Sequence, residues 1–342
     1  MRPEAIDAVE LRIVRLPLVR PFSAAHGSTS TRDVLLVRVT GGDREGWGEC
    51  AAATTTDYWH ETVQSAWADL TASAGAPPAG PMARAALEMA LLDHGLRGAG
   101  RSLAEHLGGT RRRIDATATA GFDDDPDELL AAGYRTLKLK VSPDHRDIVK
   151  TDDSVALQVD ANGSFDPARD ADVLANLDEA GLTLIEQPFP RDRIDAHVEL
   201  TRTLRTPVGL DESIATVDDA REAVALDACR VVCVKPSRLG GIEAAVRAHD
   251  LCVAERMDAK VGGMLETGIG RAAALALAAL PGFTVAADLS ASDRYWAEDI
   301  VEEPFVLDGD GRLSVPTGPG LGVTVRIDAI ERATVERAVL TL

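Results

Sequence analysis

Five charged residues recur at a nearly constant interval in the middle third of the chain. They are Lys140, Asp160, Glu186, Asp211 and Lys235, which are separated by 20, 26, 25 and 24 positions. Each ends a short apolar run with strand character, and the interval is the length of a strand–loop–helix–loop unit. Because parallel strands of a barrel end at the same face, we expect two lysines and three carboxylates to meet at one site.

Three carboxylates on neighbouring strand ends repel one another, so they need a counter-charge. A divalent cation meets this need, and a set of Asp and Glu without histidine favours Mg²⁺ or Mn²⁺ over Zn²⁺. We therefore predict Asp160, Glu186 and Asp211 as metal ligands. A single aspartate is more often a helix cap or a partner in a surface salt bridge. The position of all three at the ends of apolar strands favours the metal site.

Two lysines are predicted as the catalytic residues. Lys138 and Lys140 lie two positions apart in an apolar strand, so their side chains point to the same face. Their charge needs a local partner, and a metal-bound carboxylate substrate supplies one. Lys235 ends a strand across the predicted barrel, with three strands between it and Lys140. Lys140 and Lys235 on opposite faces of a carboxylate suit removal of the proton α to it, while a metal stabilises the enediolate.

Strand and helix signals alternate from about Arg113, with eight strand candidates that finish near residues 283–290. This count fits an α/β protein with a parallel barrel. Segments that are apolar on one side fall between the later strands and predict helices there. The segments after the first and second strands leave room for only a short helix or none.

The first part of the chain, to about Gly109, is predicted as a separate α+β unit. It has strand signals at residues 9–18 and 33–40, a polar loop at 22–31 and a helix at 83–98. The tail from about Glu302 has strand character, and we expect it to pack back on this first unit.

The composition predicts a cytoplasmic globular enzyme. The chain has 342 residues, 45% of them apolar, but it contains no apolar stretch of the roughly 18 residues that span a membrane. Its start lacks the pattern of a signal peptide. A formal net charge of −19 leaves no basic stripe for nucleic acid or an anionic membrane. The four cysteines lack the spacing of zinc sites and are expected to be buried thiols.

Five barrel segments resemble the enolase superfamily, muconate-lactonizing-enzyme subgroup. They are KLK (138–140), VDAN (159–162), IEQP (185–188), LDES (210–213) and VKPSRLGG (234–241). Further segments are similar to the o-succinylbenzoate synthase and N-succinylamino acid racemase family. These are GGMLETGIGRAAALALAALPGF (262–283), SASDRYW (290–296), PTGPGLGV (316–323), GWGEC (46–50) and PLVRPF (17–22). The resemblance therefore spans nearly the whole chain.

This resemblance implies an α/β fold, a (β/α)7β TIM-like barrel with an α+β capping domain. The capping domain would consist of the N-terminal segment and the C-terminal tail. The corresponding division is residues 1–112 for the capping domain, 113–301 for the barrel and 302–342 for the returning tail.

The resemblance also implies a reaction, the syn elimination of water from 2-succinyl-6-hydroxy-2,4-cyclohexadiene-1-carboxylate to give o-succinylbenzoate for menaquinone synthesis. Enolase-superfamily sites use a Lys or His base with magnesium, and here Lys140 would take the α proton. Lys235 would stay protonated and stabilise the planar dienediolate through a cation–π contact. The partner would be a small anionic succinyl compound, and self-association into a homo-oligomer stays open.

Matched residue by residue, the family pattern implies further substrate contacts. Together with Lys138 and Arg238 they are Phe22, Thr119, Asn162, Gly263, Met264, Leu265 and Ser290. The alternative for Thr119 and Ser290 is a hydrogen bond to their own strand ends, and for Met264 a place in the core. Arg238 is either a loop cation or a second charge that keeps Lys235 ready for catalysis. The loop at 22–30 is expected to close over the succinyl tail.

Two other functions are alternatives to this lyase. An N-succinylamino acid racemase would use the same lysines in alternation, on opposite faces of an N-succinylamino acid, alone or as a second activity. The fold and the charged residues do not discriminate between the isomerase and the lyase. The third function is a non-catalytic metal-binding scaffold. Such a scaffold would have no reason to retain two buried lysines, because their desolvation costs stability.

Overall fold

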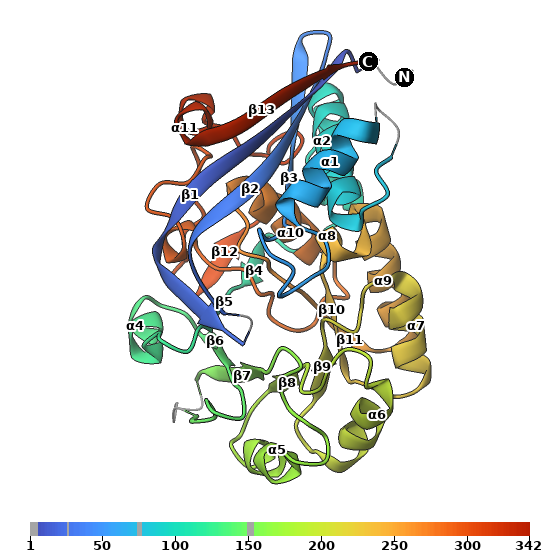
Figure 1. Cartoon of the computed structure of the whole chain (residues 1–342), viewed down its shortest axis with the longest axis vertical. Coiled ribbons are helices and arrows are strands. Elements are labelled where there is room, and N and C mark those ends of the chain that lie inside the picture. The colour runs from blue at the N-terminus through green and yellow to red at the C-terminus, as the bar shows by residue number, and fades with distance from the viewer. Residues whose placement is uncertain (1–5, 26, 74–76, 149–153) are drawn as a thin grey trace.

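The computed structural model describes residues 6–25, 27–73, 77–148 and 154–342. Figure 1 shows a long antiparallel sheet at one end of the molecule and a curved parallel sheet with helices around it. The antiparallel sheet comes mostly from the start of the chain, and the parallel sheet comes from its middle.

The antiparallel sheet has the strand order β13–β1–β2–β3. Its strands are β1 (Ala8–Ala24), β2 (Gly27–Gly41), β3 (Arg44–Cys50) and β13 (Thr334–Thr341), and it is covered by α1 (Val63–Ser73) and α2 (Pro81–Ala99). Helix α2 confirms the helix predicted at 83–98. It packs closely on β3 because Gly48 has no side chain. A Cβ at Gly48 would lie 2.0 Å from the carbonyl oxygen of Ala86.

The segment predicted as a polar loop at 22–31 is instead the end of a β-hairpin formed by β1 and β2. The prediction was wrong because these residues are polar and mostly exposed, and cross-strand pairing rather than burial holds them in strand geometry. The amide of Phe122 donates to the carbonyl oxygen of Ser23 (3.0 Å), so the hairpin reaches the barrel. His26, which lies in this segment, is outside the described residues.

Seven parallel strands form the curved sheet in the order β11–β10–β9–β8–β7–β6–β5. They are β5 (Thr117–Ala120), β6 (Thr136–Lys140), β7 (Ala156–Asp160), β8 (Leu184–Glu186), β9 (Val208–Leu210), β10 (Val231–Val234) and β11 (Asp258–Val261). The register places Lys140 opposite Asp160, and Asp160 opposite Glu186. The predicted charged residues therefore lie at one end of neighbouring strands.

Residues 284–290 fill the eighth position of the barrel without regular strand geometry. The amide of Asp288 donates to the carbonyl oxygen of Val261 on β11 (2.9 Å). On the other side, the amide of Thr117 on β5 donates to the carbonyl oxygen of Leu289 (3.2 Å). The sheet is thus closed, and the predicted TIM-like barrel is confirmed with an irregular eighth strand.

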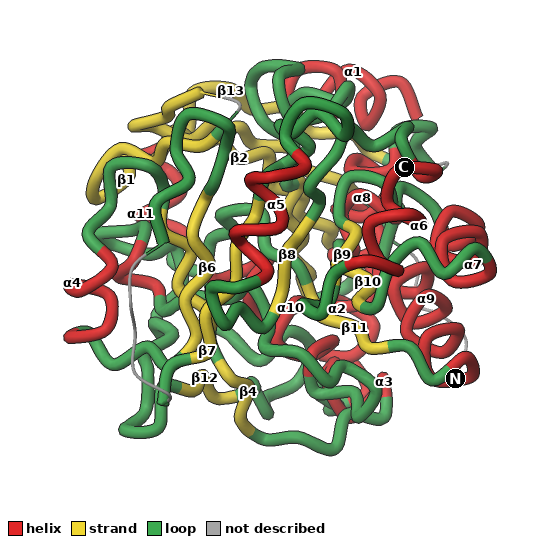
Figure 2. Tube along the Cα trace, turned by 90° about the horizontal axis from the view of Figure 1, so that it is seen from below, coloured by secondary structure: helices red, strands yellow, loops and turns green. Residues whose placement is uncertain are grey.

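Helices lie outside the parallel strands, as Figure 2 shows for α7 and α9 on one side and α4 on another. They are α4 (Pro126–Ala131), α5 (Ala171–Asp178), α6 (Ile194–Thr203), α7 (Val217–Ala225), α8 (Pro236–Leu239), α9 (Ile242–Glu255) and α10 (Gly268–Ala278). As predicted, the first two connections are short. Helix α4 has 6 residues, and the described residues between β6 and β7, 141–148 and 154–155, contain no helix.

The C-terminal tail returns to the antiparallel sheet. Strand β12 (Arg312–Ser314) pairs with β4 (Arg113–Asp115), and β13 pairs antiparallel with β1. Helix α11 (Ile327–Ala333) interrupts the strand character that we predicted for this tail. The remaining elements are α3 (Leu103–Leu107) and the 3₁₀ helix η1 (Ser292–Arg294). The division of the chain after residues 112 and 301 stays a prediction.

A buried carboxylate ties the antiparallel sheet to the barrel. Glu49 on β3 accepts hydrogen bonds from the amides of Thr267 (3.0 Å) and Gly270 (2.9 Å) and from the Thr267 hydroxyl (2.6 Å). It therefore satisfies free donors at the start of α10. Burial raises the pKa of Glu49 to about 7. This contact holds β2 and β3 over the barrel.

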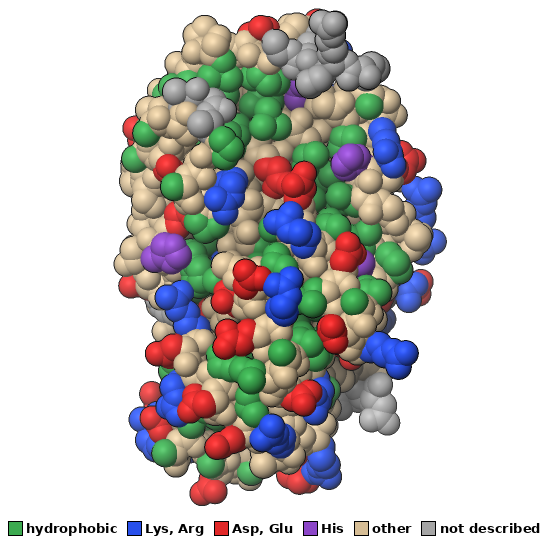
Figure 3. Space-filling model, turned by 90° about the vertical axis from the view of Figure 1, so that its right-hand side faces the viewer, with side chains coloured by type: hydrophobic (Ala, Val, Ile, Leu, Met, Phe, Trp, Pro, Cys, Tyr) green, Lys and Arg blue, Asp and Glu red, His purple; other side chains and the backbone are tan. Residues whose placement is uncertain are grey.

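Among the described residues, no helix combines the length and the apolar character needed to cross a membrane. On the face shown in Figure 3, acidic and basic side chains are interspersed. Helix α7, at the right of Figure 1, carries one such close pair, Arg221 with Asp218. The visible part of this face is therefore mixed in charge.

His197 on α6 makes stability depend on pH. Its Nδ1 lies 2.9 Å from the carbonyl oxygen of Arg193, and its Nε2 accepts the amide of Phe189 at 3.3 Å. Burial lowers the pKa of His197 from 6.5 to about 4. Between these two values the unfolded chain binds a proton that the folded protein does not, so falling pH favours unfolding.

We expect a change from pH 7 to pH 5 to cost about 2 kcal/mol of unfolding free energy through His197. Urea unfolding of the wild type and of His197→Gln at both pH values measures this contribution, which the variant should lose. His106→Gln, at an exposed position of α3, is the matched control and should keep the wild-type dependence. An identical pH dependence of wild type and His197→Gln would contradict the assignment.

Candidate active site

A cavity of about 400 Å³ lies between the antiparallel sheet and the ends of the barrel strands. Its wall comes from the hairpin of β1 and β2, the loop after β3 and the barrel. The predicted site residues in this wall are Phe22, Thr119, Lys138, Lys140, Asp160, Asn162, Lys235, Gly263, Met264, Leu265 and Ser290. Glu186, Asp211 and Arg238 are fully buried and lie outside the lining.

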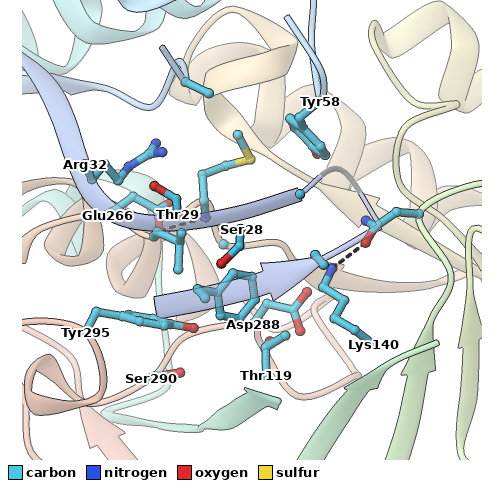
Figure 4. A pocket seen from close by; sticks show the side chains of 18 of the residues that line it. Ser28, Thr29, Arg32, Tyr58, Thr119, Lys140, Glu266, Asp288, Ser290 and Tyr295 are labelled. Carbon is cyan, nitrogen blue, oxygen red and sulfur yellow. Dashed lines mark hydrogen bonds between the residues drawn. The ribbon is translucent and has the colours of Figure 1, made fainter. Parts of the chain in front are cut away.

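Lys140, at the end of β6, is held by the neighbouring strand. Its Nζ donates to Asp160 Oδ2 and to Asn162 Oδ1, each at 2.7 Å. Asn162, in a left-handed conformation with φ 45°, also donates from Nδ2 to Glu212 Oε1 at 2.9 Å. The Lys140 side chain is 10% exposed, and Figure 4 shows it at the edge of the cavity. Its ammonium group is therefore within reach of a bound molecule.

Lys235 follows β10, and three strands separate it from Lys140 in the sheet. Its Nζ donates to Asp211 Oδ2 (2.7 Å) and to the hydroxyl of Tyr58 (2.8 Å). Gly262 leaves room for this side chain, since a Cβ there would lie 2.7 Å from Lys235 Cε. Both lysines line the same cavity from different strands.

Arg238 is a fully buried residue of α8 and not a loop cation. It donates to Asp211 Oδ1 at 2.5 Å and to the Tyr58 hydroxyl at 2.7 Å. These are the two residues that Lys235 also contacts. Arg238 therefore lies beside Lys235 as a second positive charge, and its role in keeping Lys235 ready for catalysis stays a prediction.

A second network lies deeper in the barrel. Asp288, in the irregular eighth strand, accepts hydrogen bonds from Lys138 (2.6 Å) and from Lys260 on β11 (2.7 Å). Glu186 accepts from the same two lysines, each at 3.1 Å. Lys260 is fully buried and also donates to Gln158 Oε1 at 3.0 Å. Two cations and two carboxylates thus compensate one another inside the barrel.

Neighbouring cations keep two of the predicted ligands ionised. Burial opposes ionisation of Asp211, but the charges of Arg238 and Lys235 outweigh it and hold the pKa well below its usual range. Burial also opposes ionisation of Asp160, and the charge of Lys140 outweighs it, so the pKa is lowered. Both carboxylates are therefore available as negatively charged ligands.

At two other acids, burial has the largest effect on the pKa. It raises the pKa of Glu186 despite the charges of Lys138 and Lys260. Burial, followed by the charge of Asp211, raises the pKa of Glu212 to about 7. The Oε2 atom of Glu212 has no hydrogen-bond partner among the described residues. One carboxylate oxygen at this end of the barrel is thus without a partner among the described residues.

Asp160, Glu186 and Asp211 fit Mg²⁺ or Mn²⁺ in their chemistry, because they offer hard oxygen ligands at the ends of β7, β8 and β9. Each carboxylate is engaged by Lys or Arg. Within the described ranges, the potential ligand atoms of three acids or thiols come within 4.8 Å only at Glu186, Cys233 and Asp288. Asp160, Glu186 and Asp211 do not meet this distance as a set, and a cation held by them would replace their contacts with lysine and arginine. Burial raises the pKa of Cys233, which disfavours a thiolate ligand.

Some residues predicted to contact the substrate also have contacts within the protein. Ser290 donates to the carbonyl oxygen of Thr117, at the start of the neighbouring strand β5, at 2.9 Å and not to its own strand end, and it also lines the cavity. Met264 packs against the core of the antiparallel sheet and lines the cavity as well. Gly263 must lack a side chain, because a Cβ would lie 2.1 Å from the carbonyl oxygen of Asp288.

The sequence analysis missed four residues of these networks. Asp288 and Lys260 lie in the last two barrel strands, in the same kind of apolar segment that pointed to the other charged residues, so a signal was present. Glu212 directly follows a predicted ligand, Asp211. Tyr58 comes from the loop after β3, far away in sequence and without strand character, so only the folded chain reveals it.

Comparison with known proteins finds similarity along the whole chain. Residues 123–329 match the family model described as enolase C-terminal domain-like. An N-succinylamino acid racemase from an Amycolatopsis species is 41% identical, and the alignment covers 96% of this chain and 97% of the relative. The o-succinylbenzoate synthase of Geobacillus kaustophilus is 37% identical, with 96% of each chain covered.

Two solved structures have similar folds. A member of the enolase superfamily from Listeria innocua superposes with a TM-score of 0.89 at 31% identity, covering 99% of both chains. A muconate lactonizing enzyme from Pseudomonas fluorescens, complexed with muconolactone, has a TM-score of 0.89 at 26% identity and covers 97% of this chain and 100% of its own.

The buried pair of Lys260 and Asp288 should be strongly coupled in stability. Lys260→Met and Asp288→Asn each leave a buried partner uncompensated, so we expect each to lose about 3 kcal/mol of unfolding free energy. The double variant should lose less than the sum by about 1 kcal/mol or more. Urea unfolding without added metal ions measures all four proteins.

The exposed pair of Arg312 and Asp115, at 2.7 Å, is the matched control. Arg312→Met and Asp115→Asn should each change the unfolding free energy by less than about 1 kcal/mol, without measurable coupling. Strictly additive losses at Lys260 and Asp288 would show that the two residues do not act as a pair.

Proposed function

The chain belongs to the enolase superfamily, and on this premise we propose that it removes the proton α to the carboxylate of a small succinyl-bearing substrate. The reaction we propose is that of an o-succinylbenzoate synthase. The observation that supports it most directly is that Lys140 and Lys235 line one cavity from strands on either side of three carboxylate-bearing strands. The similarity to a full-length relative named o-succinylbenzoate synthase supports the lyase reaction.

In the proposed dehydration, Lys140 enters as the free amine and takes the proton from the carbon α to the substrate carboxylate. The electron pair of the broken C–H bond forms the dienediolate. Collapse of the dienediolate breaks the bond between the ring and the hydroxyl group. The ammonium group of Lys140 returns its proton to the departing hydroxyl on the same face, so water leaves and the ring becomes aromatic.

Lys235 remains protonated throughout the proposed dehydration. Burial lowers its pKa, but the charge of Asp211 outweighs burial and raises the pKa well above the usual value. An ammonium group at this position stabilises negative charge on the planar dienediolate from the face opposite Lys140. The hydrogen bond from Lys235 to the Tyr58 hydroxyl helps to orient this ammonium group.

We propose that Asp160, Glu186 and Asp211 hold Mg²⁺, or Mn²⁺ in its place. When bound, such an ion acts as a Lewis acid toward the oxygens on which negative charge develops. The carboxylates would exchange their contacts with Lys138, Lys140 and Lys235 for contacts with the ion. Each lysine would then be free to face the substrate.

N-succinylamino acid racemase is the second candidate function. Its support is the 41% identity to a relative of that name and the presence of a lysine on each side of the cavity. In this reaction Lys140 and Lys235 would alternate, one removing the α proton and the other returning a proton to the opposite face. The same cavity would serve both substrates.

We also propose that residues 1–112 and the tail 302–342 form a capping domain over the barrel at 113–301. Pairing of β13 with β1, and a cavity wall drawn from both parts, support this division. The enzyme would act in the cytoplasm on a small anionic succinyl compound, as a monomer or a homo-oligomer.

Lysine variants separate the two proposed reactions. Lys140→Ala should lower kcat for dehydration and racemisation by about 10³-fold or more, because both need its amine. Lys235→Arg keeps the charge but is a poor acid or base, so it should retain more dehydration than racemisation. Assays with the cyclohexadiene substrate and with N-succinylphenylglycine in D₂O measure both, and Arg221→Ala on exposed α7 is the control. Equal loss of both reactions in Lys235→Arg would contradict the proposal that Lys235 acts in the dehydration only as a cation and transfers no proton.

Metal dependence tests the predicted ligand set. Chelation should abolish turnover, and added Mg²⁺ should restore it. Independently of activity, Mg²⁺ should raise the thermal midpoint of the wild type, because the ion binds only the folded chain. Asp160→Asn should show no such rise, whereas Asp115→Asn, at an exposed position, should show the full rise. The ligand set is wrong if Asp160→Asn responds like the wild type.

A further inference from the structure

Arg32 is a half-buried cation in the wall of the cavity, and no residue that the structure describes forms an ion pair with it. It lies on β2, and its Nη2 donates to the carbonyl oxygen of Ala51 at 2.7 Å. Its Nε is buried, and none of the residues that the structure describes accepts a hydrogen bond from it. Within the same ranges, no carboxylate oxygen lies within 4.0 Å of its guanidinium. The remaining donors of its planar fork are therefore unused.

The nearest acids have other partners. Glu49 and Glu266 both act on Arg32 electrostatically. Glu49 is engaged by Thr267 and Gly270, and Glu266 accepts the amide of Met264 at 2.9 Å. Burial lowers the pKa of Arg32, but a guanidinium group stays protonated in proteins. A charge in this position is costly unless an anion binds to it.

The position of Arg32 relative to Lys140 suggests which anion this is. Figure 4 shows Arg32 and Lys140 at opposite sides of the cavity, Arg32 beside Thr29 and Glu266, and Lys140 near Asp288. Arg32 comes from the antiparallel sheet and Lys140 from the barrel. A substrate whose reacting carboxylate lies among the lysines would extend its far end toward Arg32.

We propose that the guanidinium group of Arg32 binds the second, remote carboxylate of the substrate, so that the cavity selects dicarboxylates over monocarboxylates of the same length. The pairing is charge-assisted, and a guanidinium fork matches a carboxylate in geometry. Ser28 and Thr29, which line the cavity on the same strand, add hydroxyl groups beside it. This inference rests on the proposed function, because it assigns the succinyl end of that substrate.

Two substrates that differ only at the far end test the proposal. N-succinylphenylglycine carries the remote carboxylate, and N-succinamoylphenylglycine carries an uncharged amide in its place. In the wild type with Mg²⁺, kcat/KM should be about 10-fold to 100-fold higher for the carboxylate, because one charge-assisted interaction is lost with the amide. Arg32→Gln should remove this preference, mainly through a higher KM for the carboxylate.

Arg38→Gln is the matched control, because Arg38 lies on the same strand but pairs with Glu45 and is not part of the cavity wall. It should keep the preference of the wild type. A preference that survives in folded Arg32→Gln would overturn the proposal. Equal kcat/KM for the two substrates in the wild type would also overturn the proposal. This comparison does not need the variant, so it can be made even if Arg32→Gln does not fold.

Failure of the proposed function gives a different result. In that case the wild type with Mg²⁺ turns over neither phenylglycine derivative nor the cyclohexadiene substrate. Calorimetric titration of the wild type and Arg32→Gln with both phenylglycine derivatives then decides the inference. Binding that favours the carboxylate only when Arg32 is present supports the anion site, and binding that ignores the far end refutes it.

Discussion

Charge compensation inside the barrel is the constraint on which the site depends. Five acids gather at the ends of the strands, and five cations lie among them. The acids are Asp160, Glu186, Asp211, Glu212 and Asp288, and the cations are Lys138, Lys140, Lys235, Arg238 and Lys260. An isolated buried charge costs far more than a hydrogen bond returns, so Asp160, Glu186, Asp211 and Asp288 depend on their cations. Three of these lysines, Lys138, Lys140 and Lys235, line one cavity.

The barrel and the antiparallel sheet contribute different parts of the site. Barrel strands supply the paired acids and lysines, whose spacing is fixed by strand register. The antiparallel sheet and the loop after it supply Tyr58 and Arg32. Glu49 and Gly48 hold the two parts together, one by hydrogen bonds to α10 and the other by close helix packing. In the proposed reaction, the barrel would therefore carry the chemistry, and the covering sheet would recognise the far end of the substrate.

The sequence predicted the features that depend on local periodicity. Charged residues at the ends of five apolar strands predicted the barrel and the five central residues, because strand ends of a parallel sheet meet in space. It did not predict the hairpin at 22–31, whose exposed polar residues are held by cross-strand bonds. Nor did it predict Tyr58 or Arg32, because their partners lie on distant segments. Contacts between parts of the chain that are remote in sequence leave no periodic signal.

The charges of the metal ion, the substrate and Arg32 on the covering sheet must also compensate one another. The five acids and five cations of the barrel are equal in number, so a divalent cation alone would leave an excess of positive charge at the site. A substrate with two carboxylates brings the matching negative charge. One carboxylate would meet the metal and the lysines, and the other would meet Arg32 across the cavity. A monocarboxylate of equal length would leave Arg32 uncompensated. The proposed recognition of a dianion would thus extend to the substrate the charge pairing that stabilises the acids of the barrel.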